Sequence, residues 1–497
     1  MNENPKIELI IPDPVLEVAK TLENKGFSAY LVGGCVRDSL MNRSPKDWDI
    51  TTDAKPEDIV AAFPKTVYEN KFGTVTVVNE NLGEGESRTL KNIEVTPYRR
   101  EATYSDQRHP DEVRFCSKLE DDLSRRDFTI NALAYDPFRH ELIDLYGGLK
   151  DIKDKTIRTV GNPDERFRED ALRLLRAIRF AAELGFTLNI ETQKSIFNNA
   201  ELIKKTSLER IQDEFVKILM SNRPMEGINL MSTSGLLKYI IPELEKGIGM
   251  EQGGDHIYDV WEHTLLSVQH SADKGWPLHV RLAALLHDIG KTKTRRPGQK
   301  GQKIWTFYGH EVVSERLTKE IMQRLKFPVK LIETVLKLAR NHMFFADPDK
   351  ITLSAVRRIV AKVGPDLVWD LMNLRICDRV GMGRPKEEPY RLRKYESMIE
   401  EALRAPTSVG MLKIDGLRLM EVTHETPGPK VGMILNALME EVLDKPELNT
   451  EKYLEKRALE MAQMPEKELK KLAEKGKERK EEVEKQELKK IRGKYRV

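Results

Sequence analysis

Two glycines and two aspartates near the N-terminus constrain this chain more than any other feature. Gly33 and Gly34 are followed by twelve residues and then by DWDI, which places Asp47 and Asp49 one residue apart. Alternate side chains of a strand point to the same face, so both aspartates can hold metal ions side by side. Two Mg²⁺ ions held in this way activate an attacking hydroxyl and stabilise a leaving pyrophosphate. The glycines let the backbone approach a triphosphate closely, and Arg37 can supply charge to it.

The composition of the chain indicates the cellular compartment in which it acts. Its 497 residues are 39% hydrophobic and 33% charged, which is typical of a protein with a large polar surface. The three cysteines lie far apart without a CxxC pair, so we expect a reduced, cytoplasmic protein. We find neither a secretory signal nor the roughly 20 apolar residues of a membrane span, so no membrane partner is expected. The net charge of +3 is too small to indicate a nucleic-acid partner by itself.

Periodicity predicts an α/β part followed by helices. Strand patterns alternate with amphipathic helices in the first part, and helical periodicity dominates from about residue 160. The predicted elements of the first part are a helix over 14–25, a strand over 27–34, a helix from Pro56 and strands over 73–79 and 92–98. The last segment, 465–497, holds 13 Lys and Arg against 8 Asp and Glu, a net of +5; with +3 for the whole chain, the rest carries −2. We expect this segment to be a solvated helix or disordered, with contact to RNA phosphates as the alternative.

The segment ERFREDALRLLRAIRF (165–180) has acids and arginines on one face of a predicted helix. At 100° per residue its apolar side chains fall together on the opposite face. The charged stripe consists of Arg166, Glu169, Asp170, Arg173 and Arg176. A surface helix with i,i+3 ion pairs has the same pattern, and the spacing alone does not separate the two interpretations.

The chemistry of the bases favours a sharper interpretation of this stripe. Cytosine and adenine present an amino donor beside a ring-nitrogen acceptor on the Watson–Crick edge, whereas uracil and guanine present a carbonyl beside an N–H. One carboxylate next to one guanidinium can therefore bind C or A and reject U or G. Asp170 and Arg173 form such a pair.

Several motifs occur in the order found in a known family. The segment GGCVRDSLMNRSPKDWDI resembles the nucleotidyltransferase signature of the DNA polymerase β superfamily. It is followed by RRDFTINALA (125–134), DLYGGLKDI (144–152), EDALRLLRAIRF (169–180) and SLERIQDEF (207–215). Up to about residue 220 the chain therefore resembles class II tRNA nucleotidyltransferases, the CCA-adding enzymes, and their relatives the bacterial poly(A) polymerases.

This resemblance implies roles for individual residues. Asp170 and Arg173 match a pair that acts as a protein template for the incoming base, and Arg126 and Asp127 match a pair that contacts the ribose. Segment 98–113 is similar to a flexible loop that helps to switch specificity from C to A, which argues against a CC-only enzyme. The expected nucleotide-binding residues are Gly33, Gly34, Arg37, Arg126, Asp127, Asn131, Asp170, Arg173, Arg176 and Arg179.

Asp47 and Asp49 are the expected catalytic residues, with Mg²⁺ as their metal. A lone DxD is more often a solvated turn, but the double glycine, the Arg37-Asp38 pair and the spacing together favour a metal site. Glu94 is a candidate third carboxylate of this site, and a solvated or phosphate-side position is the alternative.

A second set of metal ligands follows in the helical part. Its order, H…HD…D, is similar to that of the HD phosphohydrolase family, and imidazole and carboxylate are the ligands of a hydrolytic divalent transition metal. The matching residues are His263, His287, Asp288 and Asp378. His310 and His342 are candidates for a second metal, and we interpret Gly290 as the end of the helix that carries His287. The alternative is a scaffold in which these histidines only pack.

We therefore expect an α+β multidomain protein. A Pol β-type α/β head over 1–156 precedes a helical neck over 157–225, an HD body over 226–390 and a helical tail over 391–497. The resemblance implies a CCA-adding tRNA nucleotidyltransferase that uses CTP, ATP and tRNA, with Mg²⁺ in the head and a divalent transition metal in a phosphohydrolytic HD body. The alternatives are a poly(A) polymerase or A-adding enzyme, or an HD hydrolase whose head only binds; the intact DWD and EDALR argue against the latter.

Overall fold

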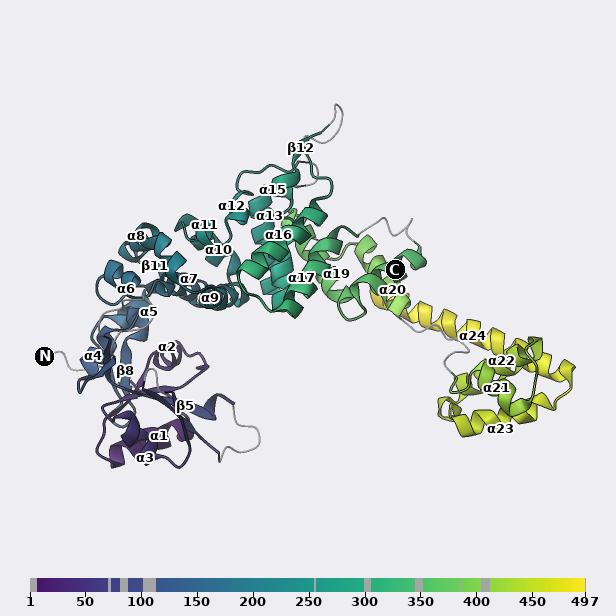
Figure 1. Cartoon of the computed structure of the whole chain (residues 1–497), viewed down its shortest axis with the longest axis horizontal. Coiled ribbons are helices and arrows are strands. Elements are labelled where there is room, and N and C mark those ends of the chain that lie inside the picture. The colour runs from purple at the N-terminus through teal and green to yellow at the C-terminus, as the bar shows by residue number, and fades with distance from the viewer. Residues whose placement is uncertain are drawn as a thin grey trace. The chain divides into compact units, whose positions relative to one another are not determined.

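The computed structural model of the chain describes residues 7–69, 73–80, 88–101, 113–253, 256–298, 305–344, 352–384, 386–403 and 412–496. The chain divides into two compact units (Figure 1). The first comprises Met1–Arg340 and Cys377–Gly383, and the second comprises Asn341–Ile376 and Arg384–Val497. Among the described residues, no helix is both long and apolar enough to cross a bilayer.

A seven-stranded mixed sheet forms the head of the first unit. Its strand order is β3-β4-β5-β2-β1-β8-β9, in which β2 and β5 are parallel and the other neighbours are antiparallel. The strands are β1 (Ala29–Val32), β2 (Asp49–Thr52), β3 (Thr66–Glu69), β4 (Thr74–Val78), β5 (Asn92–Pro97), β8 (Leu133–Asp136) and β9 (Glu141–Asp144). The strands predicted over 27–34, 73–79 and 92–98 are thus confirmed as β1, β4 and β5.

Three helices pack on this sheet or lead into it. α1 (Asp13–Asn24) and α3 (Pro56–Ala62) each have a proline in the first turn, where its missing N–H costs no hydrogen bond. α1 buries its apolar face against the sheet in a core that includes Leu22, Leu31 and Ile50. α2 (Gly34–Leu40) begins directly after β1, so the two glycines lie where strand becomes helix. The smaller elements of the head are η1 (Arg88–Leu90), β6 (Arg99–Glu101), β7 (Val113–Phe115), α4 (Leu119–Ser124), η2 (Thr129–Asn131) and α5 (Gly148–Lys153).

The neck is helical, but the continuous helix predicted over 165–180 is wrong. The chain forms α6 (Pro163–Glu169) and then α7 (Leu172–Leu184), and between them Asp170 has the extended angles φ −141° and ψ 107°. Aspartate competes with the helix because its side chain bonds nearby backbone groups. Here the Asp170 carboxylate accepts the N–H of Leu172 at 3.0 Å and so caps α7. The remaining neck elements are β10 (Thr156–Ile157), β11 (Thr187–Leu188), α8 (Ile190–Asn199), η3 (Ala200–Lys205), α9 (Leu208–Met220) and α10 (Pro224–Thr233).

Helices also build the body of the first unit. They are α11 (Leu237–Ile240), α12 (Pro242–Glu245), α13 (Val260–Asp273), α14 (Leu278–Leu286), α15 (Lys291–Thr294), α16 (His310–Arg324), most of α17 (Val329–Asn341) and the end of α19 (Val368–Gly381), with the short strands β12 (Arg296–Pro297) and β13 (Trp305–Thr306). The prediction that Gly290 ends the helix carrying His287 is wrong, because α14 already ends at Leu286 with His287 as its cap. Gly290 is needed for space instead: a Cβ there would lie 2.3 Å from the carbonyl oxygen of His310.

The second unit has its own core, to which the charged C-terminal segment contributes. Its elements are η4 (His342–Phe344), α18 (Leu353–Val363), most of α19, α20 (Tyr390–Leu403), α21 (Gly416–Thr423), α22 (Pro429–Asp444), η6 (Pro446–Leu448), α23 (Glu451–Ala462) and α24 (Glu466–Tyr495). The segment predicted as a solvated helix or disorder forms the long helix α24. Its start is not fully solvated, because Leu469 is buried in a core with Ile434 and Leu454.

Candidate active site and metal centre

The glycine turn brings the backbone next to both carboxylates of the head. Gly33 has a φ of 76°, a conformation that glycine adopts without strain. A Cβ on Gly33 would lie 3.0 Å from Nη1 of Arg126 and 3.6 Å from Oδ2 of Asp49, and one on Gly34 would lie 3.8 Å from Oδ1 of Asp47. Side chains here would therefore fill the space in front of the carboxylates.

Three carboxylates lie near the start of β2, with Asp47 two residues before the strand. Asp49 is its first residue and is in register with Glu94 of the parallel strand β5, so the two side chains point to one face. Burial, followed by the charges of Asp47 and Glu94, raises the pKa of Asp49 to about 7, against the opposing effect of Arg126. Clustered carboxylate oxygens are the ligand type of Mg²⁺, whose charge would offset this repulsion. The donor set therefore fits the predicted magnesium site.

Residues of the head and the neck together line an open cavity of about 910 Å³. Both head and neck contribute carboxylates and arginines to its wall. Every nucleotide-binding residue predicted from the sequence contributes to its wall. The charged and glycine residues of the wall include Gly33, Gly34, Arg37, Asp47, Asp49, Arg126, Asp127, Asp170, Arg173, Arg176, Arg179 and Arg210.

Asp127 lies at the centre of a polar network in this cavity. Arg176 donates to its Oδ2 at 2.8 Å, and Asn131 donates to its Oδ1 at 3.1 Å. Arg37 donates in turn to the Asn131 side chain at 2.6 Å. Burial alone would raise the pKa of Asp127, but Arg176 outweighs burial and holds this pKa well below its usual range. The network thus fixes an ionised carboxylate, which can only accept hydrogen bonds.

Phe180 is a wall residue that was not predicted. The guanidinium groups of Arg37, Arg176 and Arg179 lie 5.2, 5.4 and 4.1 Å from its ring centre, within cation–π range. Arg179 also donates to the buried Glu214 of α9 at 3.0 Å. The aromatic ring therefore helps to gather positive charge on one side of the cavity.

Asp170 and Arg173, the predicted base-reading pair, are held by different partners. Arg210 of α9 donates to Oδ2 of Asp170 at 2.8 Å. The guanidinium of Arg173 forms an ion pair with Glu169 and donates to the carbonyl oxygens of Arg166 and Arg125, each at 3.2 Å. Both side chains are thus fixed at the cavity wall.

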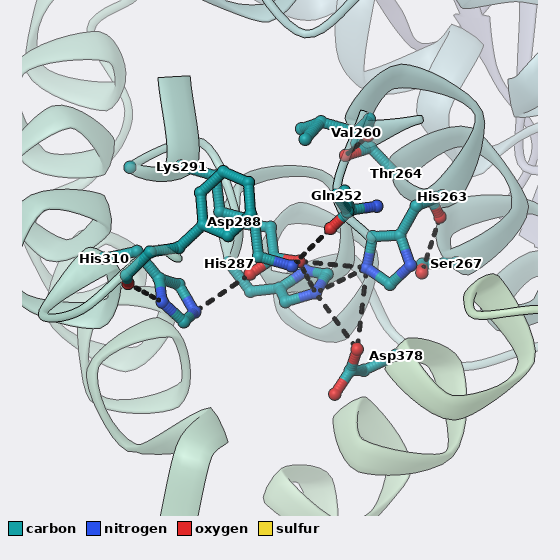
Figure 2. A network of polar contacts seen from close by, with 12 residues as sticks. Gln252, Val260, His263, Thr264, Ser267, His287, Asp288, Lys291, His310 and Asp378 are labelled. Atoms are coloured by element: carbon teal, nitrogen blue, oxygen red, sulfur yellow. Dashed lines mark hydrogen bonds and ion pairs between the residues drawn. The ribbon is translucent and has the colours of Figure 1, made fainter. Parts of the chain in front are cut away.

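The HD residues converge in the body, as Figure 2 shows. His263 comes from α13, His287 and Asp288 follow the end of α14, and Asp378 lies near the end of α19. Nε2 of His263 lies 3.0 Å from Asp288, 3.2 Å from Nε2 of His287 and 3.5 Å from Asp378. All four are buried, and their ligand atoms lie within 4.8 Å of one another. This donor set of two imidazoles and two carboxylates fits a divalent transition metal.

Protonation within this group depends on its own members. Burial alone would lower the pKa of His287, but the carboxylates of Asp288 and Asp378 outweigh burial and raise it. The Nδ1 atom of His287 lies 2.9 Å from the carbonyl oxygen of Ala284, which orients the ring. Lys291, which was not predicted, lies 2.6 Å from Oδ2 of Asp288. A bound cation would take over the charge that the imidazolium and ammonium now provide.

The two additional histidines have different surroundings. Nε2 of His310, at the start of α16, lies 3.2 Å from Oδ1 of Asp288, so His310 extends the group. His342 is buried at the start of η4 in the second compact unit, and its part in a metal site stays a prediction.

Comparison with known proteins identifies the family. Family models match residues 29–158 ("Poly A polymerase head domain"), 185–248 ("Probable RNA and SrmB- binding site of polymerase A") and 255–373 ("HD domain"). The CCA-adding enzyme of Leuconostoc mesenteroides is 30% identical over 91% of this chain and 96% of its own length. The chain belongs to the CCA-adding enzyme family. The family member from Ligilactobacillus salivarius is 44% identical, over 46% of this chain and 55% of its own length, so the chain spans about half the length of these more identical relatives.

Solved structures of the family share this fold. The Bacillus stearothermophilus CCA-adding enzyme, in complex with CTP, is 27% identical with a TM-score of 0.60, over 90% of this chain and 98% of its own. The Thermotoga maritima CCA-adding enzyme, complexed with tRNA, is 20% identical with a TM-score of 0.51, over 93% and 99%. The predicted fold class, a Pol β-type head followed by a helical neck, an HD domain and further helices, is confirmed. The boundaries of the four domains predicted from the sequence stay predictions.

Most of the residues that line the cavity and form the buried cluster were predicted from the sequence, and a few were missed. The roles of the predicted residues stay predictions, although the structure brings the head residues to one cavity and the HD residues to one cluster. Residues 102–112 of the predicted specificity loop lie outside the described residues. Arg210 and Lys291 were missed, although both lie within recognised motifs, SLERIQDEF and HDIGK.

Proposed function

We propose that this chain adds C, C and A to the 3′ end of tRNA, with CTP and ATP as donors. The observation that carries the proposal is one cavity with the carboxylates of Asp47 and Asp49 on its head side and the Asp170 and Arg173 pair in its neck wall. Membership of the CCA-adding family and the likeness to a relative solved with CTP support it.

The residues of the cavity have different roles in the proposed reaction. The tRNA 3′-oxygen forms a bond to the α-phosphorus while the bond to the bridging oxygen breaks, so pyrophosphate leaves. Asp47 and Asp49 would hold Mg²⁺, which when bound supplies Lewis-acid chemistry at the phosphates. Arg37 and the glycine turn bind the triphosphate, and Asp127, fixed by Arg176 and Asn131, orients the ribose.

Base selection follows from hydrogen-bond geometry. The Asp170 carboxylate accepts from the amino group of cytosine or adenine, and the Arg173 guanidinium donates to the adjacent ring nitrogen. Uracil and guanine place an acceptor opposite the carboxylate and a donor opposite the guanidinium. Both mismatches leave charged groups unpaired in the cavity, which costs more than a lost contact.

The test is an extension assay with purified protein and tRNA that ends either at the discriminator base or in CC. Each labelled nucleoside triphosphate is supplied separately and then together. We expect two additions with CTP alone and a third with CTP and ATP together. Long A tracts would favour a poly(A) polymerase, extension only of tRNA ending in CC would favour an A-adding enzyme, and no extension would refute the proposal.

The buried cluster of the body favours a second function, a metal-dependent phosphohydrolase. His263, His287, Asp288 and Asp378 would hold a divalent transition metal, whose bound water is more acidic than free water. A suitable substrate is a 2′,3′-cyclic or terminal phosphate on RNA, because only a free 3′-hydroxyl can be extended by the head. We also propose that the chain acts in the cytoplasm, because its three cysteines are free thiols.

A further inference from the structure

The stretch of chain between the HD residues Asp288 and His310 is basic and aromatic. Residues 289–310 contain six Lys and Arg and no Asp or Glu. Among the residues that the structure describes, Lys293, Arg295 and Arg296 form no ion pair. Cations without acidic partners attract phosphate groups, so this stretch is a candidate surface for a nucleic acid.

Strand pairing brings the cations next to aromatic rings. β12 and β13 are antiparallel, with Arg296 opposite Thr306. The guanidinium of Arg295 lies 3.7 Å from the centre of the Trp305 ring, which is a cation–π contact. Tyr308 follows β13 and is 82% exposed, and β12 lies at the upper edge of the body in Figure 1. Exposed rings beside cations are typical of surfaces that bind single-stranded RNA, because every base has a face that can stack on a ring.

The same stretch leads directly to the buried HD cluster. The centre of the Phe307 ring lies 5.7 Å from Nζ of Lys291, and this Nζ lies 2.6 Å from Oδ2 of Asp288. The carbonyl oxygen of Phe307 lies 2.8 Å from Nδ1 of His310, whose Nε2 lies 3.2 Å from Oδ1 of Asp288 (Figure 2). An RNA strand bound along β12 and β13 would therefore end beside the cluster.

We propose that this stretch forms a basic–aromatic surface, which binds the single-stranded 3′ end of an RNA and presents its terminal phosphate to the HD cluster. The members of the surface are Lys293, Arg295, Arg296, Trp305 and Tyr308. Its cations contact backbone phosphates, and the exposed ring stacks on a base. The inference rests on the proposed phosphohydrolase and deepens it, because it makes an RNA end, and not a free nucleotide, the preferred substrate. An acidic protein would use the cations but not the exposed ring, so RNA fits the whole surface better.

The experiment compares two substrates of the full-length protein with Ni²⁺, Co²⁺, Mn²⁺ and Mg²⁺ in turn. One is cytidine 2′,3′-cyclic phosphate, and the other is a single-stranded RNA of about ten nucleotides that ends in the same group. In both, water forms a bond to phosphorus and one ester bond to a ribose oxygen breaks, which leaves a phosphomonoester. The parent protein should have a higher kcat/KM for the RNA.

The decisive variant is Lys293→Ala/Arg296→Ala. At about 0.1 M salt it should lower kcat/KM for the RNA about 25-fold relative to the free nucleotide, because each phosphate contact on a single strand contributes about 0.7 to the slope of log K against log salt. Lys293→Arg/Arg296→Lys keeps both charges and should retain the preference. The matched control Arg316→Ala/Lys319→Ala removes the same residue types from exposed positions of α16 and should leave the preference unchanged.

Tyr308→Ala tests the stacking separately from the charges. Loss of one stacked base should lower the preference for RNA by about five- to a hundredfold, with no change in its salt dependence. The control is Tyr390→Ala, which removes a tyrosine that is 48% exposed at the start of α20.

Two results would overturn the inference. One is an equal fall in kcat/KM for both substrates in Lys293→Ala/Arg296→Ala, because the cations would then support the cluster and not bind RNA. The other is an unchanged preference for RNA in that variant and in Tyr308→Ala, because the surface would then belong to a different partner, such as an acidic protein.

A cross-linking measurement separates failure of this inference from failure of the proposed phosphohydrolase. The same RNA, with 4-thiouridine near its 3′ end, is irradiated with the full-length protein, and the linked peptides are identified by mass spectrometry. Cross-links to Trp305 or Tyr308 that are lost in Lys293→Ala/Arg296→Ala would establish the surface even if no phosphate ester is hydrolysed. If the RNA is hydrolysed but cross-links only to the head and neck, the inference is wrong although the HD cluster is active.

Discussion

The two candidate metal sites of this chain differ in the space beside their metal ligands. In the head, the carboxylates of Asp47 and Asp49 face a cavity of about 910 Å³ that is lined by arginines. In the body, His263, His287 and Asp378 are at most 3% exposed and contact one another. A site that must admit a triphosphate and an RNA end needs room, whereas a compact buried cluster is already shaped for one cation. Metal-ligand chemistry alone therefore does not assign a substrate; the space beside the ligands does.

Substitution of Asp49 should lower nucleotide addition more than any other change, and it tests the open site. Asp49→Asn keeps the shape of the side chain but removes a charged metal ligand, so nucleotide addition should fall on the order of a thousandfold, as loss of several kcal/mol of transition-state stabilisation implies. The matched control is Asp53→Asn at the other end of β2, whose carboxylate accepts from the N–H of Ser28 at 2.7 Å. Single-turnover extension of tRNA gives the rate, and tRNA binding should change little. Near-parental turnover in Asp49→Asn would show that the carboxylates of β2 do not hold the catalytic metal.

Substitution of the HD ligands tests whether the buried site is catalytic and whether it acts independently of the head. His287→Ala and Asp378→Ala should abolish phosphate release, a larger loss than the roughly 10–100-fold that follows removal of an outer partner of a metal ligand. His270→Ala removes another buried histidine of the body, next to Trp276, and serves as control. Hydrolysis of 2′,3′-cyclic and terminal phosphates is assayed with Ni²⁺, Co²⁺, Mn²⁺ and Mg²⁺ in turn.

CCA addition should continue in both HD variants, because none of the HD ligands lines the head cavity. Metal affinity of the body should fall as the pH falls, since imidazole and carboxylate ligands must lose their protons to bind a cation. If the parent protein hydrolysed these phosphates with none of the four ions, the body would be a folded scaffold without phosphohydrolase activity. Loss of addition in either HD variant would show that the two sites are coupled.

A smaller effect tests how the open site chooses among bases. Asp170→Ala and Arg173→Ala should lower the preference for CTP over UTP by about ten- to a hundredfold, because each charge-assisted hydrogen bond is worth ~1.5–3 kcal/mol. Overall triphosphate affinity should change less. Arg168→Ala, on the exposed side of α6, is the control. If the preference for CTP over UTP were unchanged in both variants, Asp170 and Arg173 would be surface ion-pair residues and not base-reading groups.

The two sites also differ in how far the sequence predicted them. Gly33, Asp47 and Asp49 are close in sequence, but β2 begins only at Asp49, so the strand alternation predicted for Asp47 and Asp49 does not by itself place Asp47. The HD ligands come from two helices, α13 and α19, and from the turn after α14, so their convergence rested on a resemblance and not on local periodicity. A motif of widely spaced residues carries no geometry of its own.

Local rules failed at two positions where tertiary contacts decide the backbone. A helical wheel treated 165–180 as one helix, but Asp170 breaks it, caps α7 and bonds Arg210 of a helix 40 residues further on. Gly290 looked like a helix end because glycine is common there. Its φ of −66° is ordinary, and the close approach of α16 is the reason for the glycine. Neither contact is visible in a single stretch of sequence.

A substitution at Gly290 tests that explanation and should change activity less than the substitutions above. A Cβ there would lie 2.3 Å from the carbonyl oxygen of His310 and 2.6 Å from the backbone nitrogen of Ser314, so the start of α16 must move. Overpacking of this kind costs about 1–3 kcal/mol, and Gly290→Ala should lower the denaturation temperature and weaken metal binding by the body.

The matched variant is Gly432→Ala in the interior of α22, where a Cβ would meet nothing within 4 Å. Alanine is the better helix former there by roughly 0.5–1 kcal/mol, so this substitution should stabilise the chain slightly. Thermal denaturation of both variants, with CCA addition measured alongside, separates loss of space from loss of flexibility. If Gly290→Ala melted like the parent and bound metal normally, the glycine would not be required for the approach of α16, and the buried site would tolerate changes as readily as the open one.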